Sequence, residues 1–247
     1  MAPMEPIQAA LAKAGADLAA DRIKGFLQKL LGPAVEEAGL ILQDHVRRYR
    51  LQNQIKILGK AQSMLERANI NPKAVPLKTL LPLLENASLE EDEDLQSKWA
   101  GLLANASRDF DAVPPCFSEI LKQLSPNEAR LLDGIHDQIC AEMSRVYEEI
   151  DISMLRFLGS AGLQHDSIGK LFVRLGLSSV PWTRLRDHPD KNVAADVRTQ
   201  RIRLGTALDN LMRLGLLYTE IGSKYRDKYF LSTLGFEFVA ACQHPAV

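Results

Sequence analysis

Residues 76–106 constrain the fold more than any other stretch of the sequence. The five consecutive carboxylates of residues 90–94 precede an apolar pattern of helical period that carries Trp99. Ser88 and Glu91 have the spacing of a capping box, and carboxylates in a first turn interact favourably with the helix dipole. The pattern therefore predicts a helix that begins after Ser88. Its buried face is predicted to contain Leu95, Trp99, Leu102, Leu103 and Ala106.

The composition favours a mainly helical chain that buries a sizeable core. Hydrophobic residues make up 46% of the 247 residues and aromatic ones only 6%, while Leu and Ala are abundant. Ala and unbranched side chains lose little entropy in a helix, so helices are favoured over sheets. The formal net charge is -1. This charge excludes a global field that attracts nucleic acid or an acidic membrane, so such binding needs a local patch.

Prolines, glycines and breaks in the helical period divide the chain into three parts. We expect an amphipathic N-terminal helix in residues 1–32, a helical domain in 33–110, and a winged-helix-like domain in 116–247. The segment 109–115, rich in Asp and Pro, marks the boundary between the last two parts. An irregular insertion is expected around 150–197.

The last fifty residues predict a helix, a β-hairpin and a second helix. Apolar residues recur at helical spacing over 199–214, and strand-forming residues at 216–221 and 228–231 flank a Gly-Ser turn. Ser232 or Thr233 then caps a final helix. This order is typical of the end of a winged helix-turn-helix.

Three further signals set local structure. Residues 125–128 form a second capping box, with Pro126 at the first helical position. Gly176 and Gly215 each follow a helical stretch, which predicts a left-handed cap at both positions. The polar segment 178–192 is predicted to be a surface loop.

The sequence contains no recognisable catalytic motif. Its nearest approach to a phosphate-binding loop has the wrong glycine spacing, and no GxSxG, HExxH or zinc quartet is present. His136 has no second ligand at metal spacing, so we interpret it as a packed or edge histidine. We predict a non-enzymatic protein without cofactor or metal, and reduced thiols at the three widely spaced cysteines, Cys116, Cys140 and Cys242.

A basic region near the C-terminus is the first candidate binding surface. Seven basic and three acidic residues between positions 198 and 228 give a local net charge of +4. A basic helix followed by a basic hairpin places phosphate contacts along a groove, but winged helices also serve as protein-interaction modules. The candidate residues for nucleic acid or partner binding are Arg198, Arg201, Arg203, Arg213, Lys224, Arg226 and Lys228.

The acidic run is the second candidate surface, and it has two interpretations. The carboxylates start and solubilise a helix, or they bind a basic partner. A metal site is rejected because consecutive positions on one helix radiate outward instead of converging on an ion. The residues of this acidic partner surface are Glu90, Glu91, Asp92, Glu93 and Asp94.

The N-terminal segment raises the question of a membrane. No apolar run approaches the ~20 residues that a spanning helix needs, and the first residues lack the pattern of a secretory signal. We therefore expect a cytoplasmic protein. A helix over residues 6–31 leaves peripheral membrane contact open, although acidic residues dilute its basic face.

Several long segments resemble the abortive-infection alpha family of bacterial phage-defence proteins. They are residues 30–58, 72–106, 116–133 and 211–243. The resemblance implies a role in abortive infection, in which an infected bacterium halts or dies before phage progeny are released. It implies no catalytic residues.

Three hypotheses follow. The first is a non-enzymatic defence protein that binds a phage or host component, with an unidentified protein as the expected partner, and triggers growth arrest. The second is a DNA-binding regulator that acts through its winged-helix-like domain. The third is a membrane-surface effector that acts through residues 6–31. Homo-oligomerisation is left open by the sequence.

Overall fold

The computed structural model describes Gly25, Lys29 and residues 48–109, 113–146, 162–186, 195–219 and 228–245. Gly25 and Lys29 are helical, and the rest of the predicted N-terminal helix lies outside the described residues. The turn of the predicted hairpin, with Lys224 and Arg226, also lies outside them.

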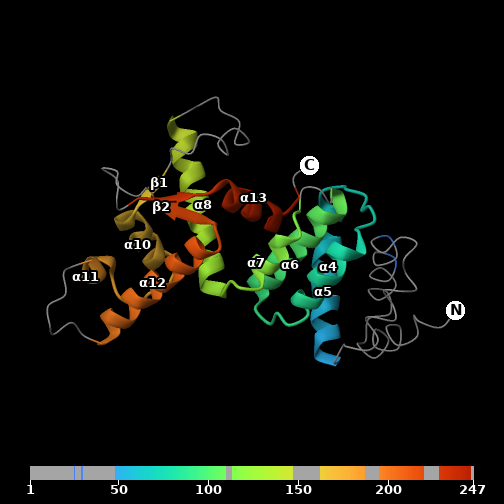
Figure 1. The fold of residues 1–247 in the computed structure, drawn as a ribbon, viewed down its shortest axis with the longest axis horizontal. Coiled ribbons are helices and arrows are strands. Elements are labelled where there is room, and N and C mark those ends of the chain that lie inside the picture. The colour runs from blue at the N-terminus through green and yellow to red at the C-terminus, as the bar shows by residue number, and fades with distance from the viewer. Residues whose placement is uncertain are drawn as a thin grey trace. The chain divides into compact units, whose positions relative to one another are not determined.

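The described chain is mainly helical and carries one small antiparallel sheet (Figure 1). The predicted predominance of helices is therefore confirmed. The chain divides into two compact units. The first contains residues 1–123 and 240–247, and the second contains residues 124–239.

The first unit is built from four described helices, α4 (Arg48–Arg67), α5 (Leu77–Ala87), α6 (Glu93–Arg108) and α7 (Cys116–Leu121). Helix α6 packs most extensively on α4 and also contacts α5 and α7. Helix α7, which lies within the range predicted for the C-terminal domain, contacts α5 and α6 and clusters with the first unit. The predicted buried face of α6 is confirmed, and every residue from Trp99 to Ser107 is buried.

The capping box predicted at Ser88 is wrong. Ser88 ends α5, where its amide donates to Leu84 O at 3.0 Å and its hydroxyl donates to Glu85 O at 2.6 Å. Asp92 caps α6 instead, because its Oδ1 accepts from the amides of Asp94 and Leu95, both at 3.0 Å. Ser88 already ends α5 and therefore does not cap α6. Asp92 has an extended backbone and provides the side-chain oxygen that caps α6 instead.

The end of the chain packs on α6 within the first unit. A Cβ at Gly101 would overlap the carbonyl oxygen of Cys242. One turn further along α6, the Asn105 amide donates to Gly101 O at 3.1 Å and to Ala241 O and Gln243 O at 3.0 Å. Asn105 thus satisfies carbonyls that a helix C-terminus leaves without intrahelical donors.

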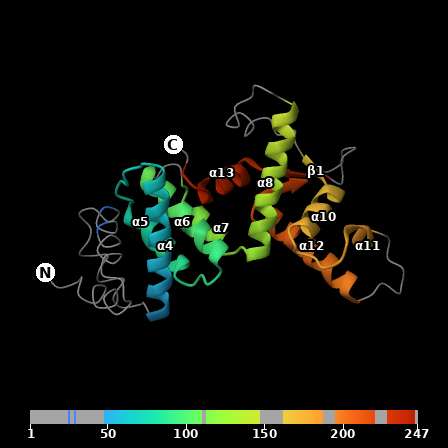
Figure 2. The same ribbon diagram turned by 180° about the vertical axis from the view of Figure 1, so that it is seen from behind.

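The second unit contains α8 (Pro126–Val146), β1 (Gly162–Gln164), α10 (His165–Arg174), α11 (Trp182–Arg186), α12 (Ala195–Arg213), β2 (Leu217–Thr219), β3 (Lys228–Leu231) and most of α13 (Thr233–Cys242). The strands pair antiparallel in the order β1-β3-β2. Helices α8, α10, α11 and α12 pack on one another beside this sheet (Figures 1 and 2).

Local signals in this unit are confirmed. The Glu128 carboxylate accepts from the Ser125 amide at 2.7 Å, and the Ser125 hydroxyl accepts from the Glu128 amide at 3.3 Å. Gly176 and Gly215 have φ of +70° and +74°, as left-handed caps require. The Ser232 hydroxyl accepts from the Gly235 amide at 2.9 Å, so Ser232 caps α13.

The surface loop predicted at 178–192 is wrong over its described part. Trp182 begins the short helix α11 and is buried, and its ring lies directly over Gly169. Its indole Nε1 donates to Asp166 Oδ1 at 2.6 Å. Gly169 thus leaves room for the Trp182 ring, and Asp166, one turn earlier on α10, accepts its hydrogen bond. The polar residues around Trp182 in the sequence had predicted a loop.

The predicted helix, hairpin and final helix of the last fifty residues are confirmed as α12, the β2–β3 pair and α13. Strand β1 was not predicted; Gly162 lies opposite Phe230 in the sheet. The winged-helix assignment itself stays a prediction.

Candidate functional site

Helix α12 carries four of the seven predicted basic residues, and its packing decides which way they face. Its buried residues recur at helical spacing and fix the inner side of the helix. They are Val197, Leu204, Ala207, Leu208 and Leu211. The opposite side is exposed. Ile202 on that side has 60% of its surface accessible, the largest fraction among the large apolar side chains that the structure describes.

The basic residues of α12 have different roles. Arg198 and Arg203 are exposed. Arg201 is half-buried, and its guanidinium donates to the carbonyls of Leu185 and Arg184 at the end of α11. Arg213 is exposed and donates to Asn210 Oδ1 at 2.7 Å. Arg201 therefore positions α11, while Arg198 and Arg203 extend from the helix.

The remaining basic candidates lie in or beyond the sheet. Lys228 is half-buried on β3, where it lies opposite Gln164 of β1. Lys224 and Arg226 lie outside the described residues. Four of the five described basic candidates therefore lie on α12, and two of them, Arg198 and Arg203, extend from its outer side.

The acidic run serves two purposes. Glu90 Oε1 accepts from the amides of Glu91 and Asp92, both at 3.0 Å, and Asp92 caps α6. Glu91, Glu93 and Asp94 are exposed. The interpretation as a helix start explains Glu90 and Asp92, and the partner-binding interpretation is now limited to the other three side chains.

Buried amides hold this acidic segment in place. Gln96 Nε2 donates to Glu90 O at 2.9 Å, and Asn53 Nδ2 on α4 donates to Ser88 O at 3.3 Å. Gln54 Nε2, also on α4, donates to Leu84 O at 3.1 Å. A buried polar group is costly without a partner, so the bonds of Asn53 and Gln54 tie the end of α5 to α4, and the bond of Gln96 ties Glu90 to α6. Composition alone does not reveal this role for the glutamines.

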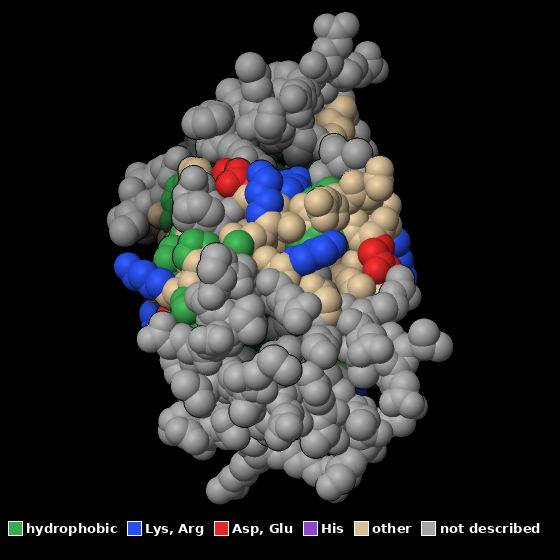
Figure 3. Space-filling view, turned by 90° about the vertical axis from the view of Figure 1, so that its right-hand side faces the viewer, with side chains coloured by type: hydrophobic (Ala, Val, Ile, Leu, Met, Phe, Trp, Pro, Cys, Tyr) green, Lys and Arg blue, Asp and Glu red, His purple; other side chains and the backbone are tan. Residues whose placement is uncertain are grey.

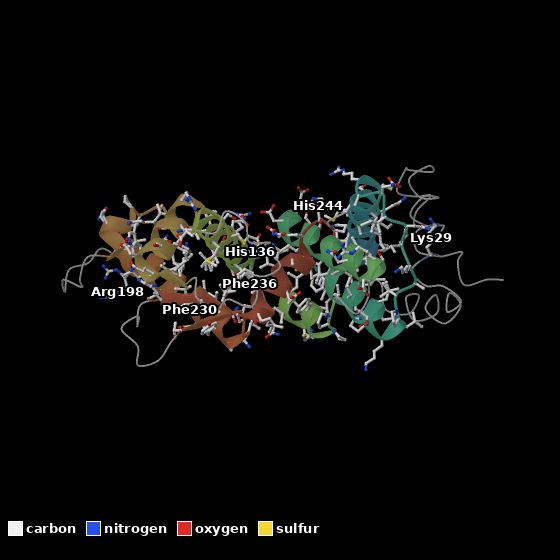
Figure 4. The ribbon with its side chains drawn as sticks, turned by 90° about the horizontal axis from the view of Figure 1, so that it is seen from above. Lys29, His136, Arg198, Phe230, Phe236 and His244 are labelled. Atoms are coloured by element: carbon white, nitrogen blue, oxygen red, sulfur yellow. The ribbon has the colours of Figure 1, made fainter. Side chains whose placement is uncertain are left out.

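A thiol, an imidazole and a carboxylate meet on α8, an arrangement that was not predicted from the sequence. Cys140 Sγ lies 3.6 Å from His136 Nε2, and His136 Nδ1 lies 3.2 Å from Asp137 Oδ1. The His136 ring packs edge-on against Phe236, as predicted for a packed histidine (Figure 4). Burial, with a smaller contribution from Asp137, raises the pKa of the Cys140 thiol. A raised pKa lowers the thiolate population, which is the opposite of what a nucleophilic cysteine requires.

Within the described residues, no group of three or more His, Cys, Asp or Glu side chains is arranged so that it could hold a metal ion. Nor does any described helix have the length and apolar character to cross a bilayer. On the described surface visible in Figure 3, Lys and Arg side chains are interspersed with acidic and apolar ones. Apart from Gly25 and Lys29, the predicted amphipathic helix at 6–31 falls outside the described residues, so peripheral membrane contact stays a prediction.

The comparisons with known proteins match one family model. The model for abortive infection alpha matches residues 52–242, which span both units. No curated protein and no solved structure gives a significant match to the chain. The matched region includes α6 with Trp99, the whole of α12 and the described sheet. The chain belongs to the abortive infection alpha family.

Proposed function

We propose that the chain acts in abortive infection as a non-enzymatic protein. It binds a phage or host component during infection and so triggers growth arrest. The observation that carries this proposal is the family match over residues 52–242, because it covers both units and most of the chain.

The topology of the second unit supports action through binding. Its elements follow the order α8, β1, α10, α12, β2 and β3, and the sheet order is β1-β3-β2. A winged helix-turn-helix has this order, with the short helix α11 as an addition. In that fold the helix before the hairpin is the one that contacts a ligand, and here that helix is α12. Its exposed Ile202, Arg198 and Arg203 agree with a contact role.

We place the protein in the cytoplasm, where phage components accumulate. The three cysteines are free thiols, and free thiols are the usual state of cysteine in a reducing compartment. This placement is part of the proposal.

Phage plating tests the proposed function. Bacteria that express the chain are compared with empty-vector cells across a broad panel of phages. We expect the plating efficiency of at least one phage to fall by about tenfold or more. Unchanged plaque numbers across the panel, with the protein present at normal level in a blot, would contradict the proposal.

A further inference from the structure

We propose that the first half of α12 binds duplex DNA through the major groove. The proposal rests on the proposed function, since it names the partner class of the same unit. The binding face, called here the α12 outer face, consists of the exposed residues Arg198, Thr199, Ile202, Arg203, Gly205 and Thr206.

Packing fixes the direction of this face. Val197, Leu204 and Leu208 are buried, so the helical positions on the other side point away from the core. Arg198, Ile202 and Thr206 follow one another at intervals of four residues and therefore lie along one side of the helix. Figure 4 shows Arg198 extending from the start of α12 away from the rest of the second unit.

The length of the face suits a groove contact. The eight steps along the helix from Arg198 to Thr206 give a rise of about 12 Å at 1.5 Å per residue. Such a length covers about three to four base pairs at the 3.4 Å rise of a DNA strand. The first residues of a recognition helix are also the ones that reach base edges in helix-turn-helix proteins.

The chemistry of the face matches DNA. No carboxylate lies between Arg198 and Thr206, although the chain as a whole has a net charge of -1. Arginine pairs with guanine or phosphate, while threonine and apolar side chains contact the thymine methyl group. A Cβ at Gly205 would meet no atom within 4 Å, so this glycine is not required for packing. Its missing side chain lets a groove wall approach the helix backbone closely.

Arg201 supports the face without belonging to it. Its guanidinium holds the carbonyls at the end of α11, which ties that short helix to α12. Since α11 also packs on α10, the Arg201 bonds link α12 to a helix that is itself packed on its neighbour. Preorganisation of this kind reduces the entropic cost of binding.

Binding of a fluorescein-labelled mixed-sequence duplex to the full-length protein tests the proposal by fluorescence anisotropy. We compare the wild type with the double variant Arg198→Ala/Arg203→Ala at low salt and over a salt series. The matched control is Arg174→Ala, which removes an exposed arginine from the last turn of α10 in the same unit. All three replaced side chains are exposed, so circular dichroism melts should coincide for the proteins.

We expect wild-type binding that weakens steeply as salt rises, because phosphate contacts release counterions. The double variant should bind about tenfold or more weakly and show a shallower salt slope, while the control stays within about twofold of wild type. Absence of duplex binding at low salt would overturn the proposal. Equal weakening of the control and the double variant would also overturn it, because the attraction would then not depend on the α12 outer face.

Plating separates this inference from the proposed function. A chain that protects against phage without binding duplex DNA would refute the DNA inference and leave the proposed function intact. Loss of protection in Ile202→Asp, with no duplex binding by the wild type, would assign the α12 outer face to a protein partner and likewise overturn the inference. A chain that binds duplex through this face without protecting would support the inference and contradict the proposed function.

Discussion

At the residue scale, Gly101 controls how closely the end of the chain approaches α6. Its missing side chain leaves room for the Cys242 carbonyl, and Asn105 on the next turn binds the neighbouring carbonyls. A glycine inside a helix costs roughly 0.5–1 kcal/mol relative to alanine. The close backbone contact at Gly101 explains why a glycine is nevertheless present there.

Replacement of this glycine should be destabilising, and a second glycine offers a matched control. Gly101→Ala forces α6 and the end of α13 apart, so we expect the free energy of unfolding to fall by about 1–3 kcal/mol. Gly205→Ala, in the open middle of α12, should raise it by about 0.5–1 kcal/mol. Urea denaturation of both variants measures the difference. Equal effects of the two substitutions would refute the close contact.

The two tryptophans of the chain differ in the hydrogen bonding of their indole nitrogens. Trp99 is 1% exposed, and its Nε1 has no partner among the described residues, whereas Trp182 Nε1 donates to Asp166. Trp99→Ala should cost about 3–5 kcal/mol of stability. Trp99→Phe should cost much less, because no hydrogen bond is lost. Trp182→Phe leaves Asp166 without its indole donor and should be the more costly of the two phenylalanine variants. Thermal melts rank the variants, and the reverse order would contradict the assigned bonding.

The three thiols should differ in reactivity toward iodoacetamide at about neutral pH. Cys116 is exposed, Cys242 is buried, and Cys140 is half-buried with a raised pKa. We expect Cys116 to be alkylated first, as read by mass spectrometry of peptides. Asp137→Asn should speed alkylation of Cys140, because removal of the negative charge lowers the thiol pKa toward its ordinary value. A Cys140 that reacts faster than Cys116 would indicate an activated thiol instead.

At the element scale, the α5–α6 connection shows where local rules succeed and fail. The same Ser-x-x-Glu spacing occurs at Ser88 and at Ser125, but only Ser125 forms a capping box. The difference is that Ser88 belongs to the end of the preceding helix, α5. Hydrophobic periodicity does not locate the end of a helix to within one residue. The apolar face around Trp99 was predictable because its period of 3.6 extends over four turns.

Elements that depend on distant partners were not predictable in this way. Strand β1 has three residues and exists because it pairs with β3, where Gly162 lies opposite Phe230, 68 positions later in the chain. The burial of Trp182 depends on Gly169 and Asp166 of another helix. The sequence was sufficient to place basic candidate residues on the helix that became α12. That Arg201 instead binds a carbonyl of α11 could be seen only in the tertiary structure.

The start of α6 gives a test at this scale. Asp92→Ala removes the acceptor for two amides and should lower stability by about 1 kcal/mol. Glu91→Ala should stay within about 0.5 kcal/mol of wild type, because its side chain is exposed. Chemical denaturation measures both variants. A larger loss of stability for Glu91→Ala than for Asp92→Ala would support the capping box predicted at Ser88 instead.

At the scale of the whole molecule, family membership covers both units and the net charge stays close to zero. A protein with little global field does not attract nucleic acid over long distances, so the proposed DNA recognition requires a local face such as that of α12. The first unit contributes a core centred on α6, and the second contributes the candidate binding face.

The most direct test of the central claim is infection of expressing cells at multiplicities below and above one. Abortive infection predicts that each infected cell stops growing or dies before it releases progeny. Cultures should therefore survive at low multiplicity, collapse at high multiplicity, and release about tenfold or more fewer phage per infected cell than empty-vector cultures. Survival of the infected cells themselves at high multiplicity, or a normal burst, would contradict the account.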